Sequence, residues 1–342
     1  MSQLVDQQRN RSEHVPALDG WRGLAVTVVL LGHFCLDRRF WYVSTLGVEL
    51  FFVLSGRLMA DILFVRQMSL PMFFARRFTR VYPALVVFIL VMGPLWWATS
   101  HESTMSAAIL ALTLTINYAI FYGFPFTIFD HIWSLCVEEH SYLLLGLVAF
   151  TFRNSSRVAA ASAVLLIGSA AMINGIIRLD VFGYNTAPTI WRTDVAMAPI
   201  FISAAFFMLS SLDDARNYWK WLTPLAAMGA VLTWFSGPNA AVYYGCSIIF
   251  LAIAVTGVDR SVLPFRAILE SRTLRFLGQC SFSIYLWQEF FYKLNVGVLP
   301  PVILLFAAIC CGVAGYYVIE RPLRLALNSM FFRPTNAPAV SG

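Results

Sequence analysis

The sequence predicts an all-helical membrane protein that crosses the bilayer several times. Of its 342 residues, 59% are hydrophobic and 12% are charged, whereas charged residues make up about 25% of an ordinary soluble domain. The apolar residues form long unbroken runs bounded by charges. This is the pattern of membrane-spanning helices, and it differs from the short alternating segments of a β-barrel. Composition therefore favours a polytopic helical fold and excludes an ordinary soluble domain.

Eleven apolar runs are candidate membrane crossings. They centre on residues 21–36, 46–65, 82–99, 105–122, 131–152, 158–177, 193–211, 220–236, 240–258, 276–294 and 299–320. If all eleven crossed from a cytoplasmic N-terminus, more Lys and Arg would lie outside than inside, against the positive-inside rule. If 105–122 enters without crossing, 17 Lys and Arg lie in cytoplasmic segments and 5 outside. We therefore expect about ten transmembrane helices, one re-entrant or interfacial helix at 105–122, and both termini in the cytoplasm.

These crossings form one multi-pass unit in the cytoplasmic (inner) membrane. We expect a cytoplasmic N-terminal segment at 1–15, a transmembrane domain at 16–325 and a cytoplasmic C-terminal tail at 326–342. Residues 1–15 lead directly into the first span without a cleavage site, so we expect them to be retained. Six cysteines lie in apolar runs at no metal-ligand spacing, and the basic residues lie in short loops. We therefore expect no metal site and no nucleic-acid partner.

The first span carries two ionisable residues, Arg22 and His33. Eleven helical residues bring both side chains to one face, with His33 roughly 16 Å further along the helix. Ionisable groups inside a bilayer are costly, and they are kept mostly where they pair, face a cavity or do chemistry. The spacing therefore predicts a site within the membrane, with Arg22 at its cytoplasmic edge.

The second span begins on the outer side and carries Glu49. Because it is the hairpin partner of the first span, it can bring Glu49 to His33. A carboxylate beside an imidazole fixes its tautomer and raises its basicity, as a general base requires. A structural ion pair between neighbouring helices would explain the same residues, and the sequence leaves both interpretations open.

The segment after the second span carries Arg76, Arg77 and Arg80 on a predicted amphipathic helix. Arginines held at the cytoplasmic face suit a phosphate-bearing ligand, through planar bidentate pairing. Charge alone favours the simpler alternative, in which these arginines set the topology and contact lipid headgroups.

The run at 131–152 carries a polar stripe one helix long. Glu138 shares a face with His131, Ser134, Ser141 and Tyr142, and Glu139 is adjacent. Paired carboxylates and a histidine in a membrane helix are hard to explain by packing, so we predict a functional role for this stripe.

Two later segments complete the set of polar positions. The span at 276–294 places Ser281, Tyr285 and Gln288 on one face, where hydroxyls and amides can also serve only as interhelical hydrogen bonds. At the end of the last span, Pro322 is expected to stop the helix and Glu320 to hold an arginine at the cytoplasmic mouth.

Taken together, these segments resemble the acyltransferase-3 family of integral membrane acyltransferases, which includes O-antigen, exopolysaccharide and Nod-factor O-acetylases. No single motif is decisive, but six in this order are specific, and the resemblance covers nearly the whole chain. The motifs are Leu18-Asp19-Gly20-Trp21-Arg22-Gly23 through His33, Gly47-Val48-Glu49-Leu50-Phe51-Phe52 with Ser55-Gly56, Arg76-Arg77 with Arg80 and Pro83, Trp133-Ser134-Leu135 with Glu138-Glu139, Ser281-Phe282-Ser283-Ile284-Tyr285-Leu286-Trp287, and Glu320 with Pro322.

The resemblance implies transfer of an acyl group, usually acetyl, from cytoplasmic acyl-CoA to a hydroxyl of a glycan or lipid-linked sugar. It makes the Arg22/His33 pair central to catalysis, with His33 as general base and Glu49 as its orienter. The expected ligands of the CoA phosphates are Arg22, Arg76, Arg77 and Arg80. The residues expected on the acceptor side are Ser134, Glu138, Glu139, Tyr142 and Tyr285.

Three positions depart from the family pattern. Glu49 stands where the family more often has Asp, His140 replaces a common Gln, and Gln288 stands where many members carry a His. The last change leaves His33 with more of the catalytic role. A proton-coupled transporter or glycan exporter is the main rival, since intramembrane His and Glu residues also form proton relays. The chain has no detectable inverted repeat, which favours acyl transfer.

Overall fold

The computed structural model describes residues 15–36, 42–100, 104–183, 186–212, 217–236, 239–294 and 299–331. All regular elements within these ranges are helical, which agrees with the predicted fold class. The expected N-terminal segment before residue 15 and the tail from residue 332 lie outside the described residues, as do His14, Arg38, Arg39, His101 and Arg216.

The helices follow one another with short connections, and single π- or 3-10-helical turns (η) extend several of them. The first elements are α2 (Pro16–Leu30), η1 (Leu31–Cys35), α3 (Tyr42–Ala60), η3 (Asp61–Val65), α4 (Leu70–Ser100), α5 (Met105–Leu112), α6 (Ile116–Phe121), η4 (Asp130–Ile132) and α7 (Trp133–Thr151). The remaining elements are α8 (Arg157–Ile176), η5 (Ile177–Val181), α9 (Ala187–Ile190), α10 (Thr193–Ala196), α11 (Ala198–Ser210), α12 (Trp219–Trp234), η6 (Ala241–Cys246), α13 (Ser247–Thr256), η7 (Val258–Arg260), α14 (Leu263–Leu269), α15 (Arg272–Lys293), α16 (Pro301–Gly315), η8 (Tyr316–Glu320) and α17 (Arg321–Phe331).

Five helical stretches of the described chain are long and apolar enough to cross a membrane. They are Leu70–Ser100, Asp130–Thr151, Arg157–Val181, Thr193–Ser210 and Pro301–Phe331. The count of ten crossings stays a prediction. Helices α5 and α6 have 8 and 6 residues, which gives rises of about 12 and 9 Å. Neither alone can cross a hydrocarbon core of about 30 Å, and the re-entrant or interfacial placement of 105–122 stays a prediction.

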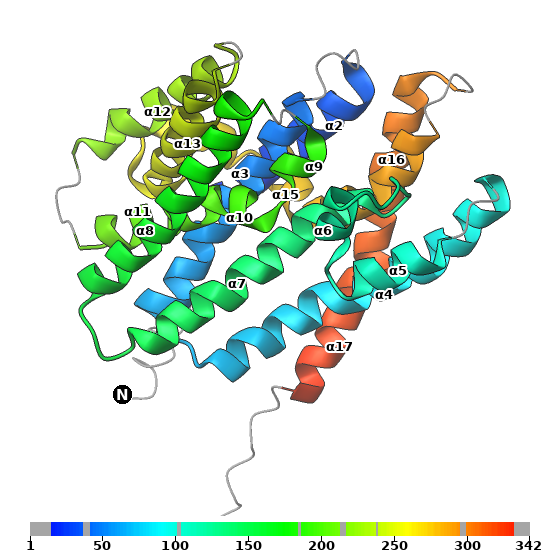
Figure 1. Ribbon diagram of the computed structural model, residues 1–342, viewed down its shortest axis with the longest axis horizontal. Helices are drawn as coiled ribbons and strands as arrows, with labels where there is room; N and C mark the ends of the chain where they lie inside the picture. Colours follow the sequence, from blue (N-terminus) through cyan, green and yellow to red (C-terminus); the bar gives the residue numbers. More distant parts are fainter. Residues whose placement is uncertain are drawn as a thin grey trace, which may run out of the picture.

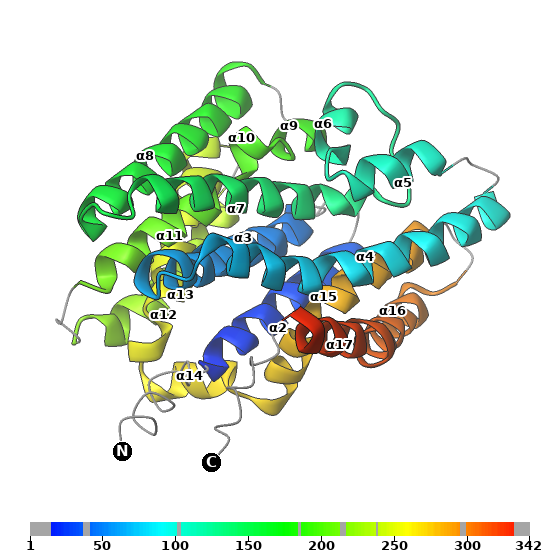
Figure 2. The same cartoon turned by 90° about the horizontal axis from the view of Figure 1, so that it is seen from below.

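Helices α2, α3, α7 and α15 occupy the middle of the molecule (Figures 1 and 2). Helices α8, α11, α12 and α13 lie on one side of them, and α4, α16 and α17 lie on the other. The central pair, α2 and α15, run in the same direction and touch through glycines. A methyl group on Gly23 would lie 2.0 Å from the carbonyl oxygen of Leu274, and one on Gly278 would lie 1.8 Å from that of Asp19.

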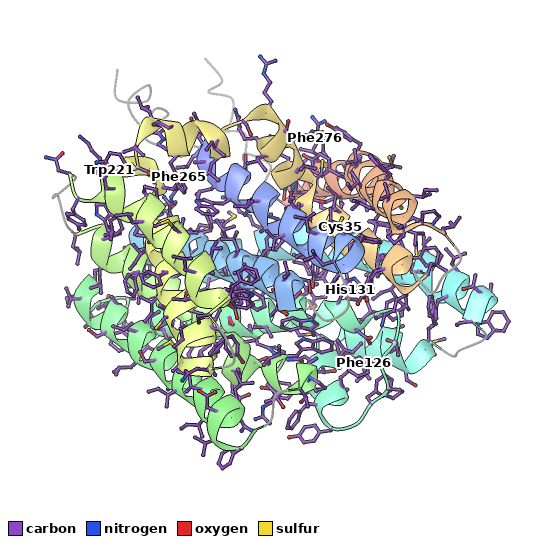
Figure 3. All side chains as sticks on the ribbon, turned by 90° about the horizontal axis from the view of Figure 1, so that it is seen from above. Cys35, Phe126, His131, Trp221, Phe265 and Phe276 are labelled. Atoms are coloured by element: carbon purple, nitrogen blue, oxygen red, sulfur yellow. The ribbon has the colours of Figure 1, made fainter. Side chains whose placement is uncertain are left out.

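Large apolar side chains are exposed around the outside of this bundle. Leu90, Leu166 and Val318 are 68%, 71% and 73% exposed, and the exposed Phe126 and Trp221 lie toward the rim (Figure 3). A protein surrounded by water exposes few such groups in contiguous areas. An apolar surface of this kind suits contact with lipid.

A buried arginine ties α3 to the end of α13. Arg57 is 4% exposed; it donates a hydrogen bond of 2.8 Å to the carbonyl oxygen of Val255 and forms an ion pair with Asp259. The ring of Phe207 lies 5.3 Å from its guanidinium carbon. All the polar contacts of Arg57 are thus made within the protein, as a buried charge requires.

The expectation that Pro322 stops the last helix is wrong. Helix α17 begins at Arg321, directly after the π-helical turn η8, and continues to Phe331. The wider turn interrupts the regular hydrogen-bond ladder, so the missing N–H of proline is accommodated there. Glu320 does hold an arginine, since Arg324 Nη1 lies 3.3 Å from its Oε1, and Ser283 donates to its Oε2 at 2.6 Å; its place at a cytoplasmic mouth stays a prediction.

Candidate functional site

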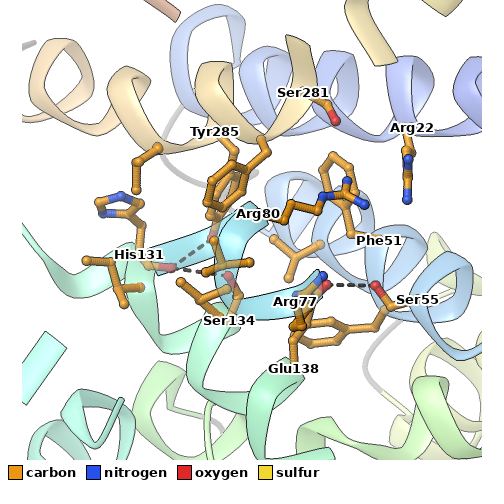
Figure 4. Close-up of a pocket in the computed structure, with 17 residues that line it drawn as sticks. Arg22, Phe51, Ser55, Arg77, Arg80, His131, Ser134, Glu138, Ser281 and Tyr285 are labelled. Carbon is orange, nitrogen blue, oxygen red and sulfur yellow. Dashed lines mark hydrogen bonds and ion pairs between the residues drawn. The ribbon is translucent and has the colours of Figure 1, made fainter. Parts of the chain in front are cut away.

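A cavity of about 90 Å³ lies where α2, α3, α4, α7 and α15 meet. Its apolar walls include Phe51, Phe52 and Leu286. The polar residues that line it are Arg22, Ser55, Arg77, Arg80, His131, Ser134, Glu138, Ser281 and Tyr285. The close-up places Arg22 toward one end of this group and His131 toward the other, with Arg80 and Tyr285 between them (Figure 4).

Two of the three cavity arginines have weak or no carboxylate pairing within the described chain. Arg22 lies 3.9 Å from Asp19, one turn earlier on α2. Arg80 faces the charges of Arg22 and Arg77, and among the described residues it forms no ion pair. Three like charges directed at one small cavity repel one another. An anionic ligand in the cavity would relieve this repulsion.

Arg77, by contrast, is fully engaged by α7. Its Nη2 lies 2.5 Å from Glu138 Oε2, its Nε lies 2.6 Å from Glu139 Oε1, and its guanidinium carbon lies 4.4 Å from the ring centroid of Tyr142. This forked pairing is the strong form of an arginine–carboxylate interaction. It fixes α4 against α7 and holds Glu138 at the cavity wall.

The expected grouping of Arg76 with Arg77 and Arg80 holds only in part. Arg77 and Arg80 are three residues apart on α4 and line the cavity, whereas Arg76 is exposed and does not line it. Successive residues of a helix are rotated by 100° about its axis. The Arg76 side chain therefore lies on a different face of α4 from that of Arg77.

The polar stripe of α7 meets α3 and α15 as the sequence suggested. Ser55 donates to Glu138 Oε1 at 2.8 Å, and Tyr142 donates to Glu138 Oε2 at 3.1 Å. The hydroxyls of Ser134 and Tyr285 are 2.8 Å apart. Ser134, Glu138 and Tyr285 therefore come together in the cavity, while Glu139 and Tyr142 stand behind it as partners of Arg77.

His33 lies beside α15 and outside the residues that line the cavity. Its Nδ1 is 2.9 Å from Gln288 Oε1, and its ring stacks on Tyr292 with centroids 4.2 Å apart. Gln288 Nε2 donates to Glu289 Oε2 at 3.2 Å. Lys293 lies 3.8 Å from Glu289 Oε1 and 2.7 Å from Asp130 Oδ2. A chain of polar contacts thus holds the imidazole from one side.

The expected contact between Glu49 and His33 is not formed. Gly47 packs against Ala25 and Val29 of α2, and Glu49, two residues on, points about 200° away from that face. Glu49 is 6% exposed, and its Oε2 has no hydrogen-bond partner among the described residues. Gln288 occupies the position beside His33 that the sequence analysis gave to Glu49.

The sequence analysis placed His131 on the polar stripe but gave it no role of its own. Its side chain lies in the interior of the bundle (Figure 3) and lines the cavity at 5% exposure. The signal was present, because His131 precedes Ser134 by three residues and Glu138 by seven, which is one helical face.

Residues 15–321 match the family model described as an acyltransferase domain. The chain belongs to the acyltransferase-3 family. This assignment agrees with the resemblance carried by the six motifs.

Several curated proteins are similar to this acyltransferase over most of its length. The O-acetyltransferase OatA of Staphylococcus aureus strain NCTC 8325 is 23% identical, over 91% of this chain and 57% of its own. The "Putative peptidoglycan O-acetyltransferase YrhL" of Bacillus subtilis strain 168 is 24% identical, over 91% and 55%. The acyltransferase thus spans less than two thirds of the length of these relatives. No solved structure matches it significantly.

Proposed function

We propose that this acyltransferase-3 protein transfers an acyl group, most readily acetyl, from cytoplasmic acyl-CoA to a hydroxyl of a cell-envelope glycan or lipid-linked sugar. The observation that carries the proposal is the cavity lined both by Arg22 and Arg80 and by the paired hydroxyls of Ser134 and Tyr285. The names of the relatives support O-acetylation, and that of YrhL favours peptidoglycan over an O-antigen as the acceptor.

Acyl-CoA fits the arginines of this cavity. Its phosphates carry negative charge. Among the described side chains Arg22 has a carboxylate only at 3.9 Å, and Arg80 forms no ion pair. Guanidinium groups bind phosphate through paired N–H donors. The co-substrate supplies an activated thioester. The protein supplies charge at one end of the cavity and uncharged hydrogen-bonding groups at the other.

We assign His33 as the base that takes the proton of the acceptor hydroxyl. The Oε1 of Gln288 lies against Nδ1, so Nδ1 carries the ring proton and Nε2 keeps its lone pair for the hydroxyl. Ser134, Glu138 and Tyr285 form the acceptor side, and Glu139 and Tyr142 support it from behind through Arg77. In this scheme Gln288 takes the orienting role first given to Glu49.

The proposed topology places this site on a path from the cytoplasm. With ten crossings and both termini inside, Arg22 near the start of α2 lies at the cytoplasmic edge, where acyl-CoA is found. His33, roughly 16 Å further along the helix, lies toward the outer half, where an envelope glycan arrives.

The decisive experiment combines a cellular and a purified assay. Mass spectrometry of envelope glycans, with and without the gene, identifies the acylated hydroxyl, and purified protein in nanodiscs then transfers label from acetyl-CoA to that glycan. We expect His33→Ala to abolish both signals while the protein remains folded. Normal glycan acylation by His33→Ala would overturn the assignment of His33, and glycan movement without acyl transfer would favour the exporter.

A further inference from the structure

His131 is a buried imidazole whose hydrogen-bonding groups are unused. It is 5% exposed, and neither Nδ1 nor Nε2 has a hydrogen-bond partner among the described residues. The carbonyl groups of Ile128 and Leu286 face the ring without reaching hydrogen-bond geometry. Leaving a buried polar group unpaired costs about 1–3 kcal/mol, so an unpaired histidine at a cavity wall calls for a ligand.

The hydrogen-bonding groups of the His131 ring indicate which kind of ligand group would complete it. A neutral imidazole offers one N–H and one lone pair. The two nearby carbonyls are acceptors, so even if the ring moved toward one of them, its lone pair would still lack a donor. The ligand that completes His131 must therefore be able to donate a hydrogen bond, and it fits better if it can also accept one.

The surroundings of His131 favour an uncharged ligand group. The rings of Phe88 and Tyr285 lie 5.5 and 5.7 Å from the imidazole, measured between centroids. The Tyr285 hydroxyl is within hydrogen-bond distance of both Ser134 Oγ and the His131 carbonyl oxygen. Arg22 lies toward the opposite end, and Arg80 lies between Arg22 and His131 (Figure 4). The cavity thus has a cationic end and a neutral end that donates and accepts.

We propose that His131 binds the acylated pantetheine arm of the donor, an inference that rests on the proposed function. An amide-containing thioester arm presents N–H donors and carbonyl acceptors and carries no charge. It complements His131 as the CoA phosphates complement Arg22 and Arg80. The cavity of about 90 Å³ is several times the roughly 10–15 Å³ that one water needs, so a ligand group larger than one water can reach the His131 ring.

The test separates the two ends of the donor. The purified 342-residue protein in nanodiscs is titrated with acetyl-CoA and with 3′,5′-ADP, which keeps the 3′-phosphate and one of the two 5′-phosphates and lacks the arm. We expect His131→Leu to weaken acetyl-CoA binding about ten-fold, the effect of one lost hydrogen bond in a dry cavity, and to leave 3′,5′-ADP binding unchanged. His131→Gln keeps a donor and an acceptor and should retain most of the affinity.

Two controls make the result decisive. His140→Leu alters another histidine of α7, which bonds Thr193 at 2.8 Å, and should leave both affinities unchanged. Thermal melting of each variant shows that it is folded; if His131→Leu does not fold, His131→Phe against His131→Gln gives the same comparison. Unchanged acetyl-CoA affinity, or an equal loss for both ligands, would overturn the role of His131. Failure of the unmodified protein to bind either ligand would instead overturn the proposed function.

Discussion

The Nδ1 atom of His33, in the turn η1 that extends α2, lies 2.9 Å from Oε1 of Gln288 on α15. The amide of Gln288 is itself oriented, because its Nε2 donates to the Glu289 carboxylate at 3.2 Å. Because the NH2 group of the amide is directed at Glu289, the amide oxygen is the atom that faces the imidazole. The position that many family members fill with a second histidine here orients the first one.

We therefore expect substitution of Gln288 to affect turnover more than donor binding. Gln288→Leu removes the acceptor for Nδ1–H and should lower kcat by about 10- to 100-fold, because a misaligned base loses much of its rate. The KM for acetyl-CoA should change less than about two-fold, because Gln288 is expected to contact His33 and not the donor. A change of this size is smaller than the effect of losing one neutral hydrogen bond. Gln288→Glu keeps an acceptor oxygen and should lose less. Equal kcat values for the Leu variant and the unmodified protein would show that Gln288 does not orient the base.

The arginine end of the cavity predicts a charge effect on donor affinity. Arg22→Gln and Arg80→Gln each remove one charge that faces the cavity, and each should weaken acetyl-CoA binding by about 10- to 100-fold, the equivalent of 1.5–3 kcal/mol for a hydrogen bond to a charged group. Isothermal titration at two salt concentrations measures the loss, which should shrink at high salt because charges are screened.

Arg76 supplies the matched control for this experiment. It lies on the same helix as Arg80 but is exposed and does not line the cavity. Arg76→Gln should change the affinity less than two-fold, in keeping with a solvent-screened surface charge. If Arg76→Gln weakened binding as much as Arg80→Gln, the CoA phosphates would bind outside the cavity.

Arg77 is expected to matter for stability first. Its contacts with Glu138 and Glu139, at 2.5 and 2.6 Å, join helices α4 and α7, and its side chain is 12% exposed. Arg77→Met leaves two carboxylates without their partner, which costs about 3–5 kcal/mol in a buried pair. Thermal melting in detergent should show a clear fall in Tm.

The ion pair of Arg266 with Glu270 gives the comparison for Arg77. Its side chains are 34% and 30% exposed, so Arg266→Met should cost less than about 1 kcal/mol. A melting curve for Arg77→Met that matched the one for Arg266→Met would show that the α4–α7 pairing does not stabilise the fold.

The sequence could predict which residues share a face within one helix, but it could not predict which faces of different helices pack together. Periodicity placed Ser134 and Glu138 on one face of α7, and the structure brings both to the cavity. The face of Glu49 could not be predicted, because it depends on which side of α3 packs on α2. The contact of Gly47 with α2 decides which side of α3 packs there. The sequence alone does not tell which helix Gly47 contacts.

Two further features depend on tertiary contacts alone. The ion pair between Arg57 and Asp259 joins residues 202 positions apart, and no local pattern connects them. The unused nitrogens of His131 become visible only when all its neighbours are known. The sequence therefore indicates which residues can carry chemistry. Which of these side chains contact one another depends on how the helices pack.

The close crossing of α2 and α15 is expected to set the geometry of the whole site, since these two helices carry Arg22, His33, Tyr285 and Gln288. A methyl group on Gly23 would lie 2.0 Å from the carbonyl oxygen of Leu274. Backbone atoms cannot move aside as a flexible side chain can, so Gly23→Ala must push the helices apart, at about 1–3 kcal/mol or more for overpacking. We expect a lower Tm and a loss of acyl transfer larger than the loss of folded protein. Gly93→Ala is the control, because its methyl group would meet side-chain atoms alone, Thr104 Oγ1 at 3.3 Å and Phe129 Cζ at 3.7 Å, and should leave both measurements nearly unchanged. Retention of full activity and Tm by Gly23→Ala would show that the two helices do not need this spacing.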